Sequence, residues 1–243
     1  MRILAIDSGN TRIKWGLREG DAWERVGVLT HDEGDALEPA LASLARPDRI
    51  AVANVAGAGA EQRIRHACAA LSAPMLWAQG QPHQCGVVNH YEQPAQLGVD
   101  RWAALIGAWR RLGRACLVVG AGTATTVDQL SSQGEFLGGV IIPGLALMKR
   151  SLAENTAQLP FAEGAWTEHP RNTADAIESG VLHAQAGAIE RLFARLAASQ
   201  GGSPACLLSG GAAAAIARCL DIPHGVADHL VLDGLAHMAG DAP

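Results

Sequence analysis

The sequence predicts an α/β protein made of two similar halves, each with a mixed or parallel sheet covered by helices. Short apolar runs that end in glycine-containing turns alternate with helical patterns along the chain, which is the rhythm of such sheets. The opening pattern of apolar run, turn and second strand also returns, with Gly9 matching Gly122. The chain has 243 residues, enough for one large domain or two small ones. We therefore predict halves at residues 1–114 and 115–243.

The first half begins with a predicted hairpin. The apolar run Ile3–Ile6 indicates a strand, the polar residues that follow indicate a turn, and alternation over 13–17 indicates a half-buried second strand. The later elements of this half are strands over 49–55 and 75–78, helices over 36–44, 61–71 and 100–112, and a Gly-, Pro-, His- and Gln-rich loop over 79–93.

The second half repeats the hairpin and continues with more helix. Thr173 is the expected cap of a long helix, because acidic residues follow it in the first turns. The expected elements are strands over 116–119, 124–128, 136–142 and 205–208, helices over 146–154, 174–198, 212–220 and 230–238, and a short strand before the last helix.

Composition excludes several classes of function. The net charge is −5, so no basic field is available to hold nucleic acid. The longest mainly apolar stretch, 137–148, has 12 residues, whereas a membrane span needs about 20. The five cysteines form no C-x-x-C pair, and the amino terminus meets Asp7 too early for a signal peptide. We expect a cytoplasmic protein that contacts neither membrane nor nucleic acid.

The first predicted turn is a candidate anion site. In Asp7-Ser8-Gly9-Asn10-Thr11, the glycine lets backbone N–H groups approach a phosphate, and the neighbouring side chains add donors. A carboxylate at the strand end can hold hydrated Mg²⁺. All these residues except threonine are also common turn formers, so an ordinary hairpin turn is the alternative.

Two further segments suggest chemistry. Gly122-Thr123-Ala124-Thr125-Thr126 matches the first turn in the other half, and two such turns facing each other would clamp a triphosphate. Asp100-Arg101 begins an amphipathic helix, where a carboxylate is favoured as the anion and can accept a proton. The alternative is a helix-start acid beside a solvated arginine.

An ordered set of motifs resembles the type III pantothenate kinases. These motifs are Asp7-Ser8-Gly9-Asn10-Thr11, Tyr91-x-x-Pro94-x-x-Leu97-Gly98-Val99-Asp100-Arg101, Gly122-Thr123-Ala124-Thr125-Thr126-Val127-Asp128, Gly138-Gly139-Val140-Ile141-Ile142-Pro143-Gly144 and Asn172-Thr173. The family belongs to the superfamily of acetate and sugar kinases, heat-shock ATPases and actin. The resemblance implies two ribonuclease-H-like halves with a nucleotide cleft between them.

The resemblance also implies an activity and its residues. The activity is ATP-dependent, Mg²⁺-assisted phosphorylation of the primary hydroxyl of pantothenate, the first step toward coenzyme A. Asp100 is then the general base, and Asp7 lies near the metal. The implied nucleotide-binding residues are Asp7, Ser8, Gly9, Asn10, Thr11, Arg12, Ile13, Lys14 and Thr123. The implied pantothenate-binding residues are Tyr91, Gly98, Val99, Asp100, Arg101 and Thr173.

One position departs from the family pattern. Many members carry an aspartate two residues before the glycine of the second turn, where it helps bind a monovalent cation. Gly120 stands there in this chain, so we expect no requirement for K⁺ or NH₄⁺. Family members are usually dimers, and a homodimer is expected here.

Two other functions remain open from the sequence. A related kinase acting on a sugar or an acyl acid would share both turns and differ only in its acceptor pocket. A regulatory protein without catalysis is the second alternative, since some bacterial relatives have been called accessory factors for gene expression.

Overall fold

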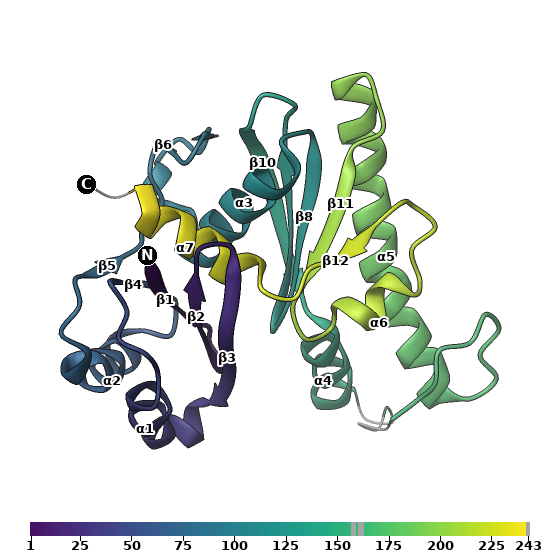
Figure 1. The fold of residues 1–243 in the computed structure, drawn as a ribbon. Coiled ribbons are helices and arrows are strands. Elements are labelled where there is room, and N and C mark those ends of the chain that lie inside the picture. Colours follow the sequence, from purple (N-terminus) through teal and green to yellow (C-terminus); the bar gives the residue numbers. More distant parts are fainter. Residues whose placement is uncertain (157–158, 160–162, 242–243) are drawn as a thin grey trace. The chain divides into compact units, whose positions relative to one another are not determined.

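The computed structural model describes residues 1–156, 159 and 163–241, and its contacts divide the chain into two units (Figure 1). The first unit comprises Met1–Gly113 together with the chain from His229 onward, and the second comprises Arg114–Asp228. The prediction places the last helix in the second half, 115–243, whereas its contacts place it in the first unit. The reason is the packing of that helix, described below.

The first unit is built on a five-stranded sheet in the order β3-β2-β1-β4-β5. β1, β2 and β3 are antiparallel neighbours, while β4 and β5 run parallel to β1. The strands are β1 Arg2–Ser8, β2 Arg12–Glu19, β3 Ala22–Thr30, β4 Arg49–Asn54 and β5 Met75–Trp77, with a small β6–β7 hairpin formed by His83–Gln84 and Val87–Asn89. The helical elements are η1 His31–Ala36, α1 Leu37–Ala42, α2 Ala58–Cys68, η2 Ala69–Leu71, η3 Pro94–Gln96, α3 Val99–Leu112 and α7 Leu230–Asp241.

Two layers of helix cover this sheet (Figure 1). Leu4 and Ile6 of β1 share a core with Leu41 of α1 and Ile64 of α2. α7 packs against β1, β4 and α3, and glycines allow a close crossing between the two helices. A Cβ at Gly234 would collide with the carbonyl of Ala103. Glycine at this position therefore lets the backbones of α7 and α3 approach closely. This packing places the last helix in the first unit.

The second unit has a sheet with the corresponding strand order. β10, β9 and β8 are antiparallel neighbours, and β11 and β12 continue the sheet parallel to β8. The elements are β8 Cys116–Ala121, β9 Ala124–Leu130, β10 Glu135–Pro143, α4 Leu145–Asn155, α5 Thr173–Gln200, β11 Ala205–Ser209, α6 Ala213–Ala217 and β12 Gly225–Val226. Its core joins Val119 of β8 and Leu208 of β11 to Ile189 of α5. Each unit thus has three antiparallel strands followed by two parallel ones, which matches the predicted duplication.

Three differences from the sequence prediction have physical reasons. β3 was not predicted, because it lies at a sheet edge where its side chains are largely exposed and the apolar alternation is weak. β6 and β7 lie within the predicted loop 79–93 and are too short to show a period. The cap of α5 is Asn172, whose Oδ1 accepts from the Asp175 N–H at 2.9 Å, so Thr173 is the first helical residue.

No helix in the described part of the chain is long and apolar enough to cross a membrane.

Candidate active site

The site in the first unit begins at a buried carboxylate. Asp7 lies near the end of the central strand β1, and β1–β2 pairing sets it opposite Lys14. Its side chain is buried, and its Oδ1 has no hydrogen-bond partner among the described residues. A buried acceptor without a partner is costly and marks a place where a ligand can complete the structure.

Asp100 lies within electrostatic range of Asp7. Burial and, to a smaller extent, the negative charge of Asp100 raise the pKa of Asp7, the Lys14 ammonium partly opposes them, and the net result is a pKa of about 7. A buried carboxylate with an orphaned oxygen, with a second carboxylate near it, fits a hard divalent cation. Mg²⁺ commonly uses one or two carboxylates together with substrate phosphates and water. The donor set therefore fits the Mg²⁺ that the sequence predicts beside Asp7.

The first turn follows directly from this carboxylate. The N–H of Gly9 donates to the Arg12 carbonyl at 3.0 Å and closes a tight hairpin. A Cβ at Gly9 would meet only that carbonyl, at 3.6 Å, which is an ordinary contact. The protein itself therefore does not require glycine here, and the open space above it suits an anion that must approach the backbone.

The predicted residues of this turn have different environments. Asn10, Thr11 and Arg12 are exposed at its tip, whereas Ser8 is buried and its hydroxyl has no hydrogen-bond partner within the described part of the chain. Ile13 is fully buried in the core, so its side chain is unable to contact a nucleotide and only its backbone remains available.

Asp100 is placed by the start of α3. Gly98 is the N-cap, and a Cβ there would lie 2.8 Å from Asp100 Oδ1. A larger residue would therefore displace the Asp100 carboxylate, whereas glycine leaves room for it. The same oxygen accepts from the Arg101 N–H at 2.9 Å. The carboxylate is thus held in one orientation at the amino end of a helix. Val99 is the first residue of this helix.

Arg101 is a buried cation beside this carboxylate. The side chain is buried, its Nη1 donates to the Tyr91 hydroxyl at 3.0 Å, and its guanidinium lies 5.8 Å from the Tyr91 ring centroid. The structure therefore brings Tyr91, Asp100 and Arg101 together as the sequence predicts. A planar guanidinium held in this way can bind a carboxylate with two parallel hydrogen bonds.

Sequence analysis missed the residue that shapes the segment carrying Tyr91. Asn89 is buried; its Oδ1 accepts from the Tyr91 N–H at 3.1 Å, and its Nδ2 donates to the Pro94 carbonyl at 3.2 Å. An asparagine that bonds the backbone two residues later is a common turn device. The Asn-x-Tyr spacing was the available signal, but the surrounding loop showed no period that would place it.

Thr123 belongs to the second unit, in the turn between β8 and β9. The Gly122 N–H donates to the Ala124 carbonyl at 3.0 Å, and a Cβ at Gly122 would meet that same carbonyl at 3.5 Å. Thr123 is exposed there. This turn is one residue shorter than the first, and it shares with the first a glycine whose Cβ would meet only an ordinary contact.

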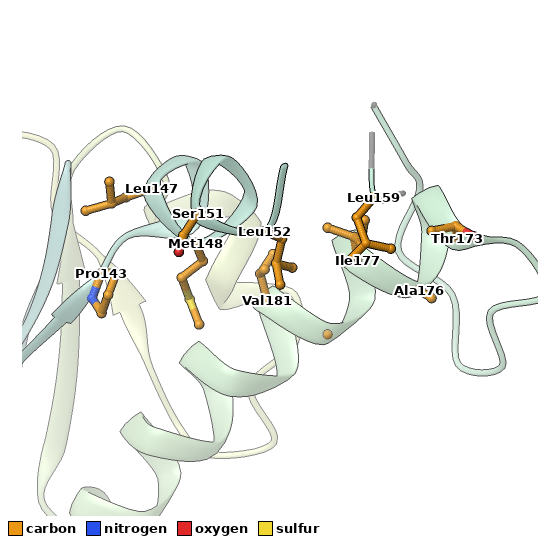
Figure 2. Close-up of a pocket in the computed structure, with 11 residues that line it drawn as sticks. Pro143, Leu147, Met148, Ser151, Leu152, Leu159, Thr173, Ala176, Ile177 and Val181 are labelled. Atoms are coloured by element: carbon orange, nitrogen blue, oxygen red, sulfur yellow. The ribbon is translucent and has the colours of Figure 1, made fainter. Parts of the chain in front are cut away.

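Thr173 also lies in the second unit, away from that turn in the sequence, at the start of α5. It lines a mainly apolar cavity of about 710 Å³ between α4 and α5, with Leu147, Met148, Leu152 and Ile177 among its walls (Figure 2). Figure 2 shows Thr173 at one end of this row of apolar side chains.

Comparisons with known proteins show the family of this chain. The family model for type III pantothenate kinase matches residues 3–195. The type III pantothenate kinase of Aromatoleum aromaticum is 53% identical over 98% of this chain and 97% of its own, and that of Dechloromonas aromatica is 50% identical over 98% of each. The chain belongs to the type III pantothenate kinase family.

Solved structures extend the likeness in fold. A protein described as a Baf family transcriptional activator from Campylobacter jejuni matches this type III pantothenate kinase family member with a TM-score of 0.63 at 20% identity, covering 98% of both chains. A ROK family glucokinase from Streptomyces griseus, solved with glucose and AMPPNP, matches with a TM-score of 0.55 at 13% identity over 100% of both chains. At these identities, the matches establish the shared fold of sugar kinases and nothing more.

The raised pKa of Asp7 gives a stability prediction for this pantothenate kinase family member. The folded-state pKa of about 7 lies above the ordinary aspartate pKa of 3.8, so folding favours the protonated acid. Stability therefore falls as the pH rises between these two values, by about 4 kcal/mol in total at about 1.4 kcal/mol per unit. Asp7→Asn keeps the site neutral and should unfold at higher urea than the wild type at about pH 8 but not at about pH 4.

The measurement is urea unfolding at both pH values without nucleotide or Mg²⁺. Asp35→Asn, which changes an exposed acid of the same unit, serves as the control. The difference between its stability at the two pH values should equal that of the wild type. Equal destabilisation by Asp7→Asn at both pH values would contradict the account.

Proposed function

We propose that this chain transfers the γ-phosphoryl group of ATP to the primary hydroxyl of pantothenate, giving phosphopantothenate for coenzyme A synthesis. The observation that supports this reaction most directly is the pair of Asp7 and Asp100. One carboxylate is buried at the end of the central strand, and the other is exposed enough to meet an acceptor at the start of α3. Family membership supplies the acceptor.

Asp7 and the first turn receive the phosphates. Asp7, whose Oδ1 has no partner among the described residues, would hold Mg²⁺, and the ion would supply positive charge to neutralise the phosphates. The backbone and side chains of residues 8–12 supply donors, with Lys14 beside Asp7 as a nearby positive charge. Thr123 contributes a matching set of donors from the second unit. Phosphoryl transfer needs mainly such positioning and charge stabilisation.

Asp100 acts as the general base. Its Oδ1 is occupied by the Arg101 N–H, which leaves the other carboxylate oxygen for the acceptor. That oxygen takes the hydroxyl proton while the hydroxyl oxygen attacks the γ-phosphorus, and the bridging oxygen leaves with ADP. The backbone hydrogen bond holds the carboxylate in one orientation, so the proton acceptor is already in place before the reaction.

Arg101 selects the substrate by its charge. Its guanidinium suits the pantothenate carboxylate, and the Tyr91 hydroxyl fixes the plane of the fork. The backbone of Gly98 and Val99 borders the same helix start, and Thr173 is assigned to the aliphatic part of the substrate because it lines an apolar cavity. A sugar acceptor has no carboxylate for Arg101, which is why pantothenate is favoured over a sugar.

The cytoplasm is the proposed location, because the reaction consumes ATP and all five cysteines are unpaired.

Asp100→Asn tests the assignment of the base. An amide is unable to accept the proton as a carboxylate does, so kcat for pantothenate phosphorylation should fall by about 10²- to 10⁴-fold. Binding of MgATP should remain, since Asp100 is not assigned to the phosphates. The assay follows phosphate transfer from ATP to pantothenate by the purified wild type and variant, with a panel of sugar and acyl-acid acceptors alongside.

Near-normal kcat in Asp100→Asn would remove the residue from this role. Transfer to a sugar or acyl acid but not to pantothenate would point to a related kinase. An absence of transfer with every acceptor would favour a regulatory protein.

The reaction is also expected to be independent of K⁺. Gly120 lies opposite Thr126 in the β8–β9 ladder, and a Cβ at Gly120 would come within 2.8 Å of Thr126 Oγ1. The strand therefore has no room for a cation-binding aspartate unless Thr126 moves. Replacing K⁺ and NH₄⁺ with tetramethylammonium should leave the rate unchanged, and a loss of most of the activity would contradict this expectation.

A homodimer is proposed from the apolar face around α4. Leu147 is 42% exposed at the rim of the cavity between α4 and α5, and Ile141 on the preceding strand is 62% exposed. Apolar surface of this kind is typically covered by a partner, and the family pattern points to a second copy. Leu147→Glu should convert the dimer to a monomer in light scattering after gel filtration.

The matched control is Val28→Glu, which changes an equally apolar and 50% exposed residue on β3 of the first unit. It should leave the dimer intact. A monomeric wild type, or a dimer that survives Leu147→Glu, would refute this interface.

A further inference from the structure

His31 lies behind the first turn and contacts its backbone. β2–β3 pairing sets Thr30 opposite Arg12, so the end of β3 returns the chain to the turn. His31 follows as the first residue of η1, with its Nε2 2.7 Å from the Gly9 carbonyl oxygen. On its other side, Arg63 of α2 places Nη2 3.1 Å from His31 Nδ1.

The two neighbours determine which nitrogen of the ring carries the proton. A guanidinium only donates, so Nδ1 must accept from Arg63. A carbonyl only accepts, so Nε2 must carry the hydrogen that reaches Gly9. His31 is therefore a neutral ring in the Nε2–H tautomer, connecting the arginine to the turn.

This hydrogen bond fixes the direction of one peptide unit. The C=O of Gly9 and the N–H of Asn10 belong to the same planar trans peptide and point in opposite directions. While His31 holds the carbonyl, the Asn10 N–H faces the other way, toward the exposed side of the turn. A glycine peptide can flip at little cost, and the flipped form would present a carbonyl oxygen to the phosphates.

The supports of His31 are themselves fixed. Glu33 Oε2 accepts from both the N–H and the hydroxyl of Thr30, at 2.9 and 3.0 Å, and this capping box sets the start of η1. Gly34 leaves space for Arg63, because a Cβ there would lie 3.3 Å from Arg63 Cδ. η1 and α2 therefore fix the positions of His31 and Arg63 beside the turn.

We propose that His31, supported by Arg63, is a positioning residue that keeps the Gly9–Asn10 peptide in the phosphate-binding orientation. The inference rests on the proposed function only in taking this turn as the phosphate site for ATP. The inference concerns the affinity for the nucleotide and makes no assumption about the acceptor.

Three variants test the proposal. His31→Leu has a similar volume but no donor, and it should raise the Kd for MgATP by about 3- to 10-fold, the effect of losing one hydrogen bond. His31→Gln retains an amide N–H that can reach the Gly9 carbonyl and should restore affinity close to the wild type. His66→Leu, on α2 with a largely exposed side chain, is the control and should have no effect. Calorimetry gives Kd, and steady-state kinetics should show an unchanged KM for pantothenate.

The tautomer gives a readout that is independent of activity. In ¹⁵N-labelled wild-type protein, NMR of the His31 ring should show a protonated Nε2 and an unprotonated Nδ1. Arg63→Met removes the donor to Nδ1 and should shift the ring toward a mixture of tautomers, with a smaller loss of MgATP affinity than His31→Leu.

The outcomes separate this inference from the proposed function. Wild-type affinity in His31→Leu, no recovery in His31→Gln, an Nδ1–H tautomer or failure of the wild type to bind MgATP would each overturn it. If MgATP affinity falls as expected but pantothenate is not phosphorylated, His31 keeps its role and the proposed acceptor is wrong.

Discussion

The site in the first unit depends on a carboxylate that is costly to ionise, chiefly because it is buried. Asp7 is buried at the end of a central strand, and the nearby charge of Asp100 adds to the cost of its ionisation. The fold tolerates this because Lys14 lies opposite Asp7 and because β1 is held between two neighbouring strands. A cation bound with nucleotide phosphates would relieve the repulsion, so the energy stored in the free protein favours ligand binding.

The remaining parts of the site are arranged around these acids. Gly98 leaves room for Asp100, the Arg101 N–H orients it, and Asn89 shapes the segment from which Tyr91 reaches Arg101. Each interaction is short-range and uses backbone or buried groups. The acceptor side of the proposed reaction is therefore positioned by the first turn of one helix and the loop before it.

The sequence predicted the features that depend on local pattern. The hairpins at Gly9 and Gly122, the helix beginning near Asp100 and the repeat of the opening hairpin in both halves all follow from apolar runs and turn residues. It missed β3, because an exposed edge strand has little alternation, and it misplaced the cap at Thr173, because Asn172 competes for the same backbone donor. The role of His31 depends on contacts with other segments, so no spacing could reveal it, whereas the Asn-x-Tyr spacing of Asn89 lay in a loop without a period. The packing of α7 on α3 depends on a contact between glycine and backbone far apart in the sequence.

The repeated turn links the duplication to the chemistry. In both units, a glycine that its own neighbours do not require follows the first strand of a three-stranded antiparallel set. Only the first unit places a carboxylate just before this glycine, since Asp7 corresponds to Gly120. The carboxylate proposed for the metal therefore belongs to the first unit alone.

A ¹³C NMR titration of the Asp7 carboxyl group tests this account most directly. In the free wild-type protein the pKa should lie near 7, fall in Asp100→Asn as the like charge is removed, and fall well below 7 when MgATP is bound. A carboxyl group that titrates near 4 in the free protein, or a pKa that MgATP leaves unchanged, would contradict the assignment of Asp7 as the metal and phosphate end of the site.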